Sequence, residues 1–332
     1  MIDFIVLVLA IALFLYAFLA GADFGAGILE ITPFGLPRKE RSSVIGKAMG
    51  PVWEANHIWL ILALVITFNA FPVIFWFLSE WFHFPLGALA IGIIFRGASF
   101  TFLHYDPIID KSQRVYHWIF GLSSLWCTMC LGVIIGSLML GDFSPNDMGI
   151  YERYFAHWLN PFCFSMGVFM TLLMVFNASL FLLMESKTNR SQWRNLTLKV
   201  FALLVISGMI AHGIFILTNP TRWKIFFYNI PSLIFVTVSF LLLFPQLYTI
   251  RRNFKNRSRI IAGMQLFCIM CAGFAPLYPK IILFRDLNYY TFNQTAAEAE
   301  VLKYLCWALI FGLLFILPGY WYLMKIFKTQ KD

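Results

Sequence analysis

The chain has 332 residues, of which 60% are hydrophobic and only 12% are charged. A soluble domain is about 25% charged, so this composition excludes a single soluble core, a disordered segment and a collagen-like fibre. The net charge is +9, but the basic residues stand in short segments between long apolar runs. This pattern is typical of membrane topology and does not indicate a nucleic-acid-binding surface.

Nine apolar segments follow one another, and each has the roughly 20 residues that a helix needs to cross the hydrocarbon layer. Because backbone groups in lipid must be hydrogen-bonded within the segment, we expect an all-α integral membrane protein with nine transmembrane helices. We expect a single transmembrane domain over 1–332, arranged as two four-helix bundles plus one peripheral helix. The predicted spans are 3–32, 51–78, 85–105, 115–140, 155–184, 197–218, 227–250, 259–281 and 301–325, the eighth interrupted by Pro276 and Pro279.

The distribution of positive charge predicts the direction of the spans. If the segment after the first span is cytoplasmic, 18 of the 25 Lys and Arg residues fall on the cytoplasmic side and six on the outer side. Cytoplasmic loops of membrane proteins carry the excess of Lys and Arg. We therefore expect the N-terminus outside and the C-terminus in the cytoplasm, which requires an odd number of spans.

The first informative charge is Asp23, which lies in the cytoplasmic half of the first predicted span. A charged side chain at the centre of a membrane helix costs about 2.5–3.5 kcal/mol on insertion scales, so Asp23 is expected to face protein or water. Gly21 and Gly25 form a small-xxx-small face beside it that allows close contact with another helix. The alternative is that both glycines only pack and that Asp23 only marks the inner interface.

A polar cluster stands at the predicted start of the second span. Pro51 suits a first helical position because its missing N–H is not needed there, and Glu54 then falls in the first turn, where the helix dipole favours a carboxylate. That is one complete explanation for Glu54. The other is functional, because a carboxylate, an amide and an imidazole within one turn can carry a proton or position water. The residues on one face of this helix are Trp53, Asn56, His57 and Leu60.

Arg96 lies near the middle of the third predicted span. Arginine stays protonated, so it cannot escape the cost of burial by losing its charge. It therefore needs a carboxylate or a polar ligand group, and Asp23 or Glu54 on a neighbouring helix is the natural partner. The alternative is an ion pair with a purely structural role.

The remaining histidines and the cysteines carry weaker signals. His212 lies inside the sixth span and could form a bis-histidine haem site with His57, but a hydrogen-bonded core imidazole is the simpler explanation. The Cys-x-x-Cys pairs lie within apolar helices, where cysteine acts as a small hydrophobic residue and we expect no metal. The histidines near span ends, interpreted as interfacial, are His83, His104, His117 and His157; the paired cysteines are Cys127, Cys130, Cys268 and Cys271.

Three segments stand out by their residue order: Gly-Ala-Asp-Phe-Gly-Ala-Gly-Ile-Leu at 21–29, Gly-Pro-Val-Trp-Glu-Ala-Asn-His-Ile-Trp-Leu at 50–60, and Phe-Arg-Gly at 95–97. Together they resemble the signature of subunit II of the cytochrome bd-type quinol oxidases. The Trp-Glu-x-Asn-x-x-Trp motif is the most specific part of this resemblance. The resemblance is clear up to residue 110 and rests on hydropathy beyond it.

The resemblance implies a respiratory complex that oxidises quinol, reduces dioxygen to water and generates a proton motive force in a bacterial or archaeal cytoplasmic membrane. Its subunit I is expected to form a pseudo-symmetric heterodimer with this chain and to hold haems b and d. This chain would not be catalytic alone. Asp23, Glu54 and Arg96 match family positions implicated in a cytoplasmic proton path toward the oxygen-reducing haem. The supporting motif residues are Gly21, Gly25, Trp53, Asn56, His57 and Trp59.

The resemblance names further partners and leaves other functions open. Lipid, a small accessory subunit and a structural quinone are candidate neighbours of this chain, and no cofactor is expected within the chain itself. A secondary transporter is an alternative, because a glycine-rich interruption near Asp23 and a midplane Arg96 could bind an anionic substrate. A b-type haem electron carrier that uses His57 and His212 is a third.

Overall fold

The computed structural model describes residues 1–33, 38–105, 112–144, 149–186 and 189–329, without the side chains at 50–56 and at a few helix ends. The helices are α1 (Ile2–Ile31), α2 (Arg38–Ala70), α3 (Pro72–Trp81), α4 (His83–Tyr105), α5 (Ser112–Leu140), η1 (Glu152–Ala156), α6 (Pro161–Glu185), α7 (Arg190–Thr218), α8 (Pro220–Phe227), α9 (Ile230–Leu241), α10 (Leu243–Arg251), α11 (Lys255–Phe274), α12 (Phe292–Thr295) and α13 (Ala299–Thr329). Two short strands, β1 (Lys280–Leu283) and β2 (Tyr289–Thr291), pair antiparallel.

The described helices have the length and apolarity of a multi-pass membrane protein. Within the described residues seven are long and apolar enough to cross a membrane, and a bent pair made of 57–70 and α3 would be an eighth. The all-helical character is therefore confirmed. The count of nine spans and the division into two four-helix bundles plus a peripheral helix stay predictions.

The second predicted span does not coincide with a single helix. α2 begins at Arg38, so position 51 lies inside the helix and Glu54 is not in a first turn. The charged residues of 38–49 hid this extension from a search for apolar runs, although most of them are good helix formers. At the other end the chain bends by 114° at Pro72, and α3 leaves the direction of α2.

The eighth predicted span ends earlier than expected. α11 stops at Phe274, before Pro276 and Pro279, and the chain then forms the β1–β2 hairpin. Proline removes a backbone donor and clashes with the preceding helical turn, so a helix commonly ends before it. Arg222 ties the hairpin to the bundle, because its Nη2 donates to the carbonyls of Gly141 and Phe284.

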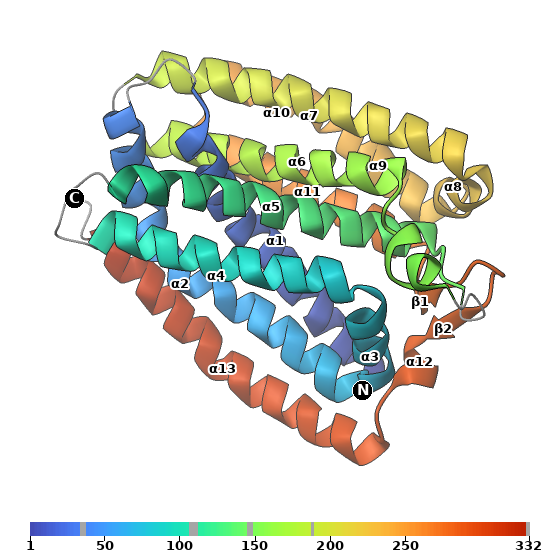
Figure 1. Ribbon diagram of the computed structural model, residues 1–332. Helices are drawn as coiled ribbons and strands as arrows, with labels where there is room; N and C mark the ends of the chain where they lie inside the picture. The colour runs from blue at the N-terminus through green and yellow to red at the C-terminus, as the bar shows by residue number, and fades with distance from the viewer. Residues whose placement is uncertain (34–37, 106–111, 145–148, 187–188, 330–332) are drawn as a thin grey trace.

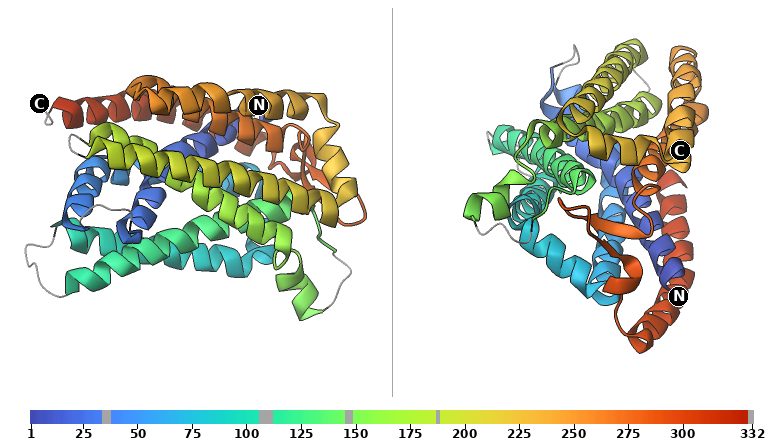
Figure 2. Two further views of the ribbon diagram at one scale, coloured as in Figure 1. Left: turned by 90° about the horizontal axis from the view of Figure 1, so that it is seen from above. Right: turned by 90° about the vertical axis from the view of Figure 1, so that its right-hand side faces the viewer.

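The long helices run back and forth between two ends of the molecule (Figure 1). At one end of the molecule α1, α4, α6, α10 and α13 finish and α2, α5, α7 and α11 begin. We call this end the basic end. The opposite, hairpin end carries α3, α8, α12 and the two strands, and Figure 2 shows the hairpin lying across the helix ends. α1 lies inside the bundle and packs against α2, α5 and α6, whereas α13 packs mainly along α2.

Close contact between α1 and α6 depends on glycine. A Cβ added at Gly25 would lie 2.1 Å from the carbonyl oxygen of Met174 and 2.8 Å from Cβ of Ala178. Gly21 lies on the same side, 3.5 Å from Met174 Cγ when its Cβ is added. The predicted small-residue contact is therefore present, and its partner is α6.

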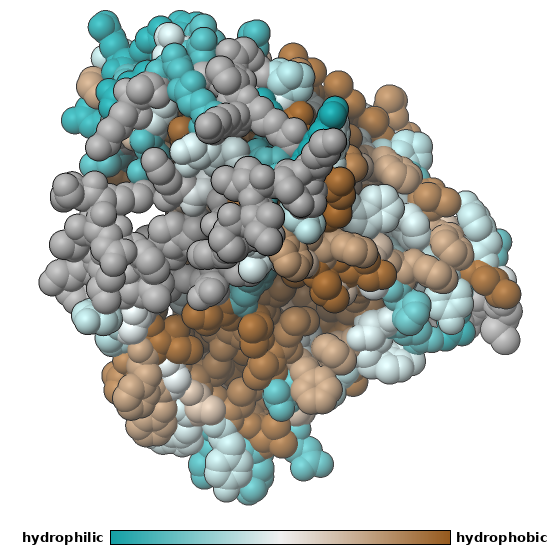
Figure 3. Space-filling view, turned by 60° about the vertical axis from the view of Figure 1, so that its left-hand side comes forward, coloured by the Kyte–Doolittle hydropathy of each residue, from teal (hydrophilic) through white to brown (hydrophobic). Residues whose placement is uncertain are grey.

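The outer surface is consistent with a lipid environment. In Figure 3 hydrophilic residues gather toward the top of the view, and a broad hydrophobic surface lies beneath them. Large apolar side chains are exposed along α13, among them Phe311, Leu314 and Phe315. Exposed apolar surface of this extent is expected where lipid or another membrane subunit covers the protein.

Candidate functional site

An ion pair lies at the centre of the bundle. Asp23 comes from α1 and Arg96 from α4, and Nη2 of Arg96 contacts Oδ1 of Asp23. Asp23 is 1% exposed and Arg96 is 0% exposed. Both charges are thus withdrawn from lipid and from bulk water, as expected for ionisable groups that a membrane protein retains inside its spans.

Aromatic rings complete the surroundings of the arginine. Cζ of Arg96 lies 4.7 Å from the ring centroid of Phe24 and 5.4 Å from that of Phe120. A guanidinium over an aromatic face is attracted by the ring quadrupole, and the attraction reaches about 2 kcal/mol when the groups are desolvated. These rings hold the guanidinium between α1 and α5 while one side of it remains directed to Asp23.

Two further titratable groups border the pair. Tyr16, two turns before Asp23 on α1, is 5% exposed, and its hydroxyl has no hydrogen-bond partner among the described residues. His57, on α2, is half-buried and lies close enough to Asp23 and Arg96 to interact electrostatically with both. The pair is therefore the centre of a small cluster of groups that can hold or pass protons.

Part of the predicted motif lies outside the described residues. The side chains of Trp53, Glu54 and Asn56 belong to this undescribed part, so the distance from Glu54 to Asp23 and Arg96 stays a prediction. Trp59, on the next turn of the same helix, is buried at 3% exposure against α1 and α4.

The sequence analysis missed a second buried acid on α1. Glu30 is 1% exposed, and its Oε1 lies 2.7 Å from Nδ1 of His117 on α5. His117 is therefore not simply interfacial, as its position near a span end had suggested. The signal that could have found Glu30 is the spacing of Tyr16, Asp23 and Glu30, because residues seven apart lie on one face of a helix.

The end of α1 next to Glu30 is held by a basic residue. Arg41, 6% exposed, donates from Nη2 to the carbonyl of Glu30 and from Nη1 to the carbonyl of Thr32, both at 2.7 Å. The last carbonyls of a helix have no partner within the helix, and a cation there also opposes the helix dipole. Arg41, which the sequence analysis counted only as a topology signal, thus caps α1.

The model of the family described as cytochrome bd terminal oxidase subunit II matches residues 1–327.

The chain belongs to the cytochrome bd terminal oxidase subunit II family.

Individual relatives agree with this family. The chain is 23% identical over 309 residues to the cytochrome bd ubiquinol oxidase subunit 2 of Bacillus subtilis, covering 91% of this chain and 87% of the relative. It is 25% identical over 219 residues to the cytochrome bd-I ubiquinol oxidase subunit 2 of Escherichia coli K12, covering 64% and 56%. Among solved structures, the bd oxidase from Geobacillus thermodenitrificans matches with a TM-score of 0.79 and 20% identity over 98% of both chains. At that identity the structural likeness shows a shared fold.

As a member of this family the chain is a membrane-spanning subunit of a terminal oxidase, and its His, Cys, Asp and Glu side chains are the groups that could ligate a haem or a metal ion. Within the described residues no group of three or more His, Cys, Asp or Glu side chains could hold a metal ion. His212 packs its ring on Trp223 and Phe227, at 6.0 and 4.6 Å between centroids, whereas His57 interacts with the charges of Asp23 and Arg96. The side chains therefore give no support to a bis-histidine haem between His57 and His212.

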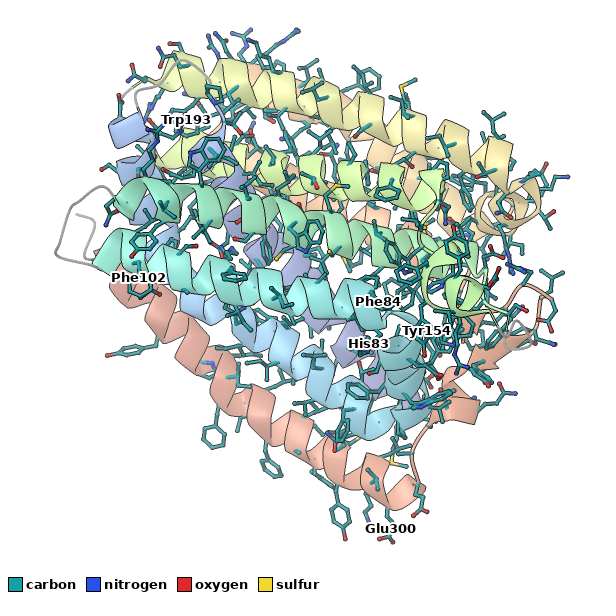
Figure 4. All side chains as sticks on the ribbon, in the orientation of Figure 1. His83, Phe84, Phe102, Tyr154, Trp193 and Glu300 are labelled. Carbon is teal, nitrogen blue, oxygen red and sulfur yellow. The ribbon has the colours of Figure 1, made fainter. Side chains whose placement is uncertain are left out.

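The other histidines of the bd-family chain differ from expectation in one case. His157 is fully buried in a cage formed by Trp81, Phe82 and Phe143, with ring centroids 5.2–5.5 Å away, and is not interfacial. His83 is exposed at the hairpin end beside Phe84, where Figure 4 shows both near Tyr154. The side chain of His104 lies outside the described residues.

The cysteines pack as apolar residues. Cys127 is fully buried and its Sγ lies 3.7 Å from the carbonyl oxygen of Leu89, and Cys130 is buried beside it in the same core. Within the helices described, Cys268 and Cys271 stand as free thiols on α11. Both pairs match the expected role of small hydrophobic side chains.

Proposed function

We propose that this chain is the subunit of a bd-type quinol oxidase that pairs with a haem-bearing subunit I in a pseudo-symmetric heterodimer. The complex oxidises quinol, reduces dioxygen to water and contributes to the proton motive force. In this proposal the chain lies in the cytoplasmic membrane of a bacterium or archaeon, with its basic end in the cytoplasm. The haems belong to subunit I, and a small accessory subunit, lipid and a structural quinone are further neighbours.

The role of this chain in the complex is to conduct protons. Reduction of dioxygen consumes protons, and these must cross low-dielectric protein to reach a buried haem. Asp23, Glu54 and Arg96 are the residues that we assign to this path. Carboxylates near the cytoplasmic side take up and release protons, while the fixed positive charge of Arg96 keeps a negative group stable inside the bundle.

The observation that supports the proposal best is the buried contact between Asp23 and Arg96. A buried ion pair is commonly no more stable than well-packed apolar residues of the same volume, so stability alone is a weak reason to keep one. Its position on α1, which packs against α2, α5 and α6, with Tyr16 and His57 close by, suits proton transfer.

The test uses the whole complex with its haem-bearing partner. Asp23→Asn keeps the size and a hydrogen-bonding group but cannot carry a proton, so oxygen consumption with quinol should fall by at least about tenfold, as for loss of a proton-transfer group. Asp23→Glu, which keeps the carboxylate, should retain most of the rate. Haem content and haem reduction by quinol without oxygen should be unchanged in both variants.

A wild-type rate for Asp23→Asn in a fully assembled complex would refute this role. A chain that purifies stably without a haem-bearing partner, and that takes up a substrate in proteoliposomes, would instead support the secondary transporter.

A further inference from the structure

Glu30 and His117 form a buried acid–base pair on the side of Asp23 that faces the basic end. The carboxylate of Glu30 is 1% exposed, whereas the side chain of His117 is 12% exposed. Oε1 of Glu30 lies 2.7 Å from Nδ1 of His117, which is an ion-pair contact when the imidazole is protonated. The imidazole can therefore exchange protons with water while the carboxylate that it contacts is closed off from water.

The packing of the helix ends does not require a titratable pair. The hydrogen bonds from Arg41 end on backbone carbonyls at 30 and 32, and these would form with any residue at position 30. A buried carboxylate–imidazole pair is rarely better for stability than an apolar pair. Among the described residues, His117 from α5 contacts the side chain of Glu30 and Arg41 from α2 contacts its backbone carbonyl, and this grouping needs a further explanation.

The hydroxyl of Ser124, which donates to the carbonyl of Phe120, lies against Gly27 in the seam between α1 and α5. Asp23, Gly27 and Glu30 stand at i, i+4 and i+7, on one face of α1, and the two acids are about 10 Å apart along the axis. A Cβ at Gly27 would collide with the hydroxyl of Ser124 and would lie 3.2 Å from the ring of Phe120. Glycine at position 27 therefore makes room for the Ser124 hydroxyl between the two acids.

We propose that His117 and Glu30 take up protons at the basic end and deliver them to Asp23 along this seam. His117 accepts a proton from water on Nε2, and the imidazolium gives its Nδ1 proton to the Glu30 carboxylate. The ring becomes neutral and Glu30 becomes a carboxylic acid. The acid then releases its proton through water and the Ser124 hydroxyl to the Asp23 carboxylate, and His117 regains its starting tautomer by exchange with water. Only O–H and N–H bonds form and break.

This inference rests on the proposed function and adds the entry of the path to it. The experiment measures oxygen consumption by the full complex carrying Glu30→Gln or His117→Gln. Glutamine at 117 keeps a polar side chain beside Glu30 but cannot carry a proton. Both variants should lower the rate by about tenfold or more, with normal haem content and normal haem reduction without oxygen.

His117→Ala supplies a readout that a merely structural role would not move. The cavity left by the ring should admit added imidazole, and imidazole should restore a large part of the lost rate. The matched control is Glu185→Gln, because Glu185 is also a carboxylate at the basic end, but it lies on α6 and pairs with Arg259 of α11 at 3.6 Å. This control should keep the wild-type rate with and without imidazole.

The possible outcomes separate the two proposals. A wild-type rate for assembled Glu30→Gln and His117→Gln, together with a slow Asp23→Asn, overturns the entry role and leaves the proposed function standing. Wild-type rates for all three overturn both. If Glu30→Gln does not assemble, His117→Gln and imidazole rescue of His117→Ala decide, and the absence of rescue with a normal His117→Gln rate counts against the entry role.

Discussion

Asp23 and Arg96 differ in how each can respond to the loss of the other. A buried carboxylate can take up a proton and become neutral, but a guanidinium remains charged at any pH that a protein survives. Removal of Asp23 thus leaves a permanent buried charge, whereas removal of Arg96 leaves a group that can discharge itself. The rings of Phe24 and Phe120 compensate only part of the charge of Arg96.

We therefore predict unequal effects of the two single substitutions on stability. Asp23→Asn should destabilise the protein by about 3 kcal/mol, which is typical when one partner of a buried pair is removed. Arg96→Gln should cost less, and the double variant should be more stable than Asp23→Asn alone. Thermal unfolding of the detergent-solubilised complex measures all three. Equal losses for the two single variants would contradict this explanation.

The contact between Asp23 and Arg96 could be predicted from the sequence, because a charge inside a span has an unfavourable free energy and each residue can neutralise the charge of the other. The pair of Glu30 and His117 was not predicted, because both residues stand near predicted span ends, where a charged side chain can reach water and costs little free energy. Only the packing of the end of α1 against the start of α5 shows that Glu30 is buried. Burial of a residue at a helix end depends on which neighbouring helix packs over that end, and a single sequence does not show this.

At the scale of elements, the bundle depends on how closely α1 approaches its neighbours. Gly25 lies against the backbone of α6 and Gly27 against α5, so α1 contacts two helices through positions that lack a side chain. Sequence reasoning predicted the first contact from the spacing of Gly21 and Gly25. It placed the start of α2 wrongly, because helices may continue beyond the membrane with charged residues, and apolarity marks only the embedded part.

Gly25→Ala should separate α1 from α6 and destabilise the protein by about 1–3 kcal/mol, as overpacking does. Gly213→Ala on α7 is the matched control, because an added Cβ there meets nothing within 4 Å. That substitution should be neutral or stabilising by about 0.5–1 kcal/mol, since alanine favours the helix. Thermal unfolding compares the two variants. Similar stability of both would show that the contact with Met174 does not limit the approach of the helices.

At the scale of the whole molecule, the two ends differ in charge and should lie on opposite sides of the membrane. The hairpin end exposes Asn288, and the basic end exposes Ser191 at the start of α7. The even alternation of long helices was predictable from hydropathy, because length and apolarity set each span. The 114° bend at Pro72 and the strand pairing near 280–291 were not, because a search for apolar runs detects neither a bend between two apolar segments nor a short hairpin.

Cysteine labelling in intact cells tests this orientation. Asn288→Cys should react with a membrane-impermeant maleimide added from outside, whereas Ser191→Cys should react only after the membrane is opened. The native chain is the control, because its described thiols lie within helices. Labelling of Ser191→Cys in intact cells would reverse the proposed topology.

The central position of α1 has a consequence for biosynthesis. α1 is synthesised before α4 and α5, which carry the partners of its two buried acids. During that interval the translocon or surrounding water must accommodate Asp23 and Glu30, and the long apolar stretch before them has to anchor the segment. Truncated chains that contain α1 but end before α5 should therefore insert unstably into the bilayer and be degraded early by membrane quality-control proteases.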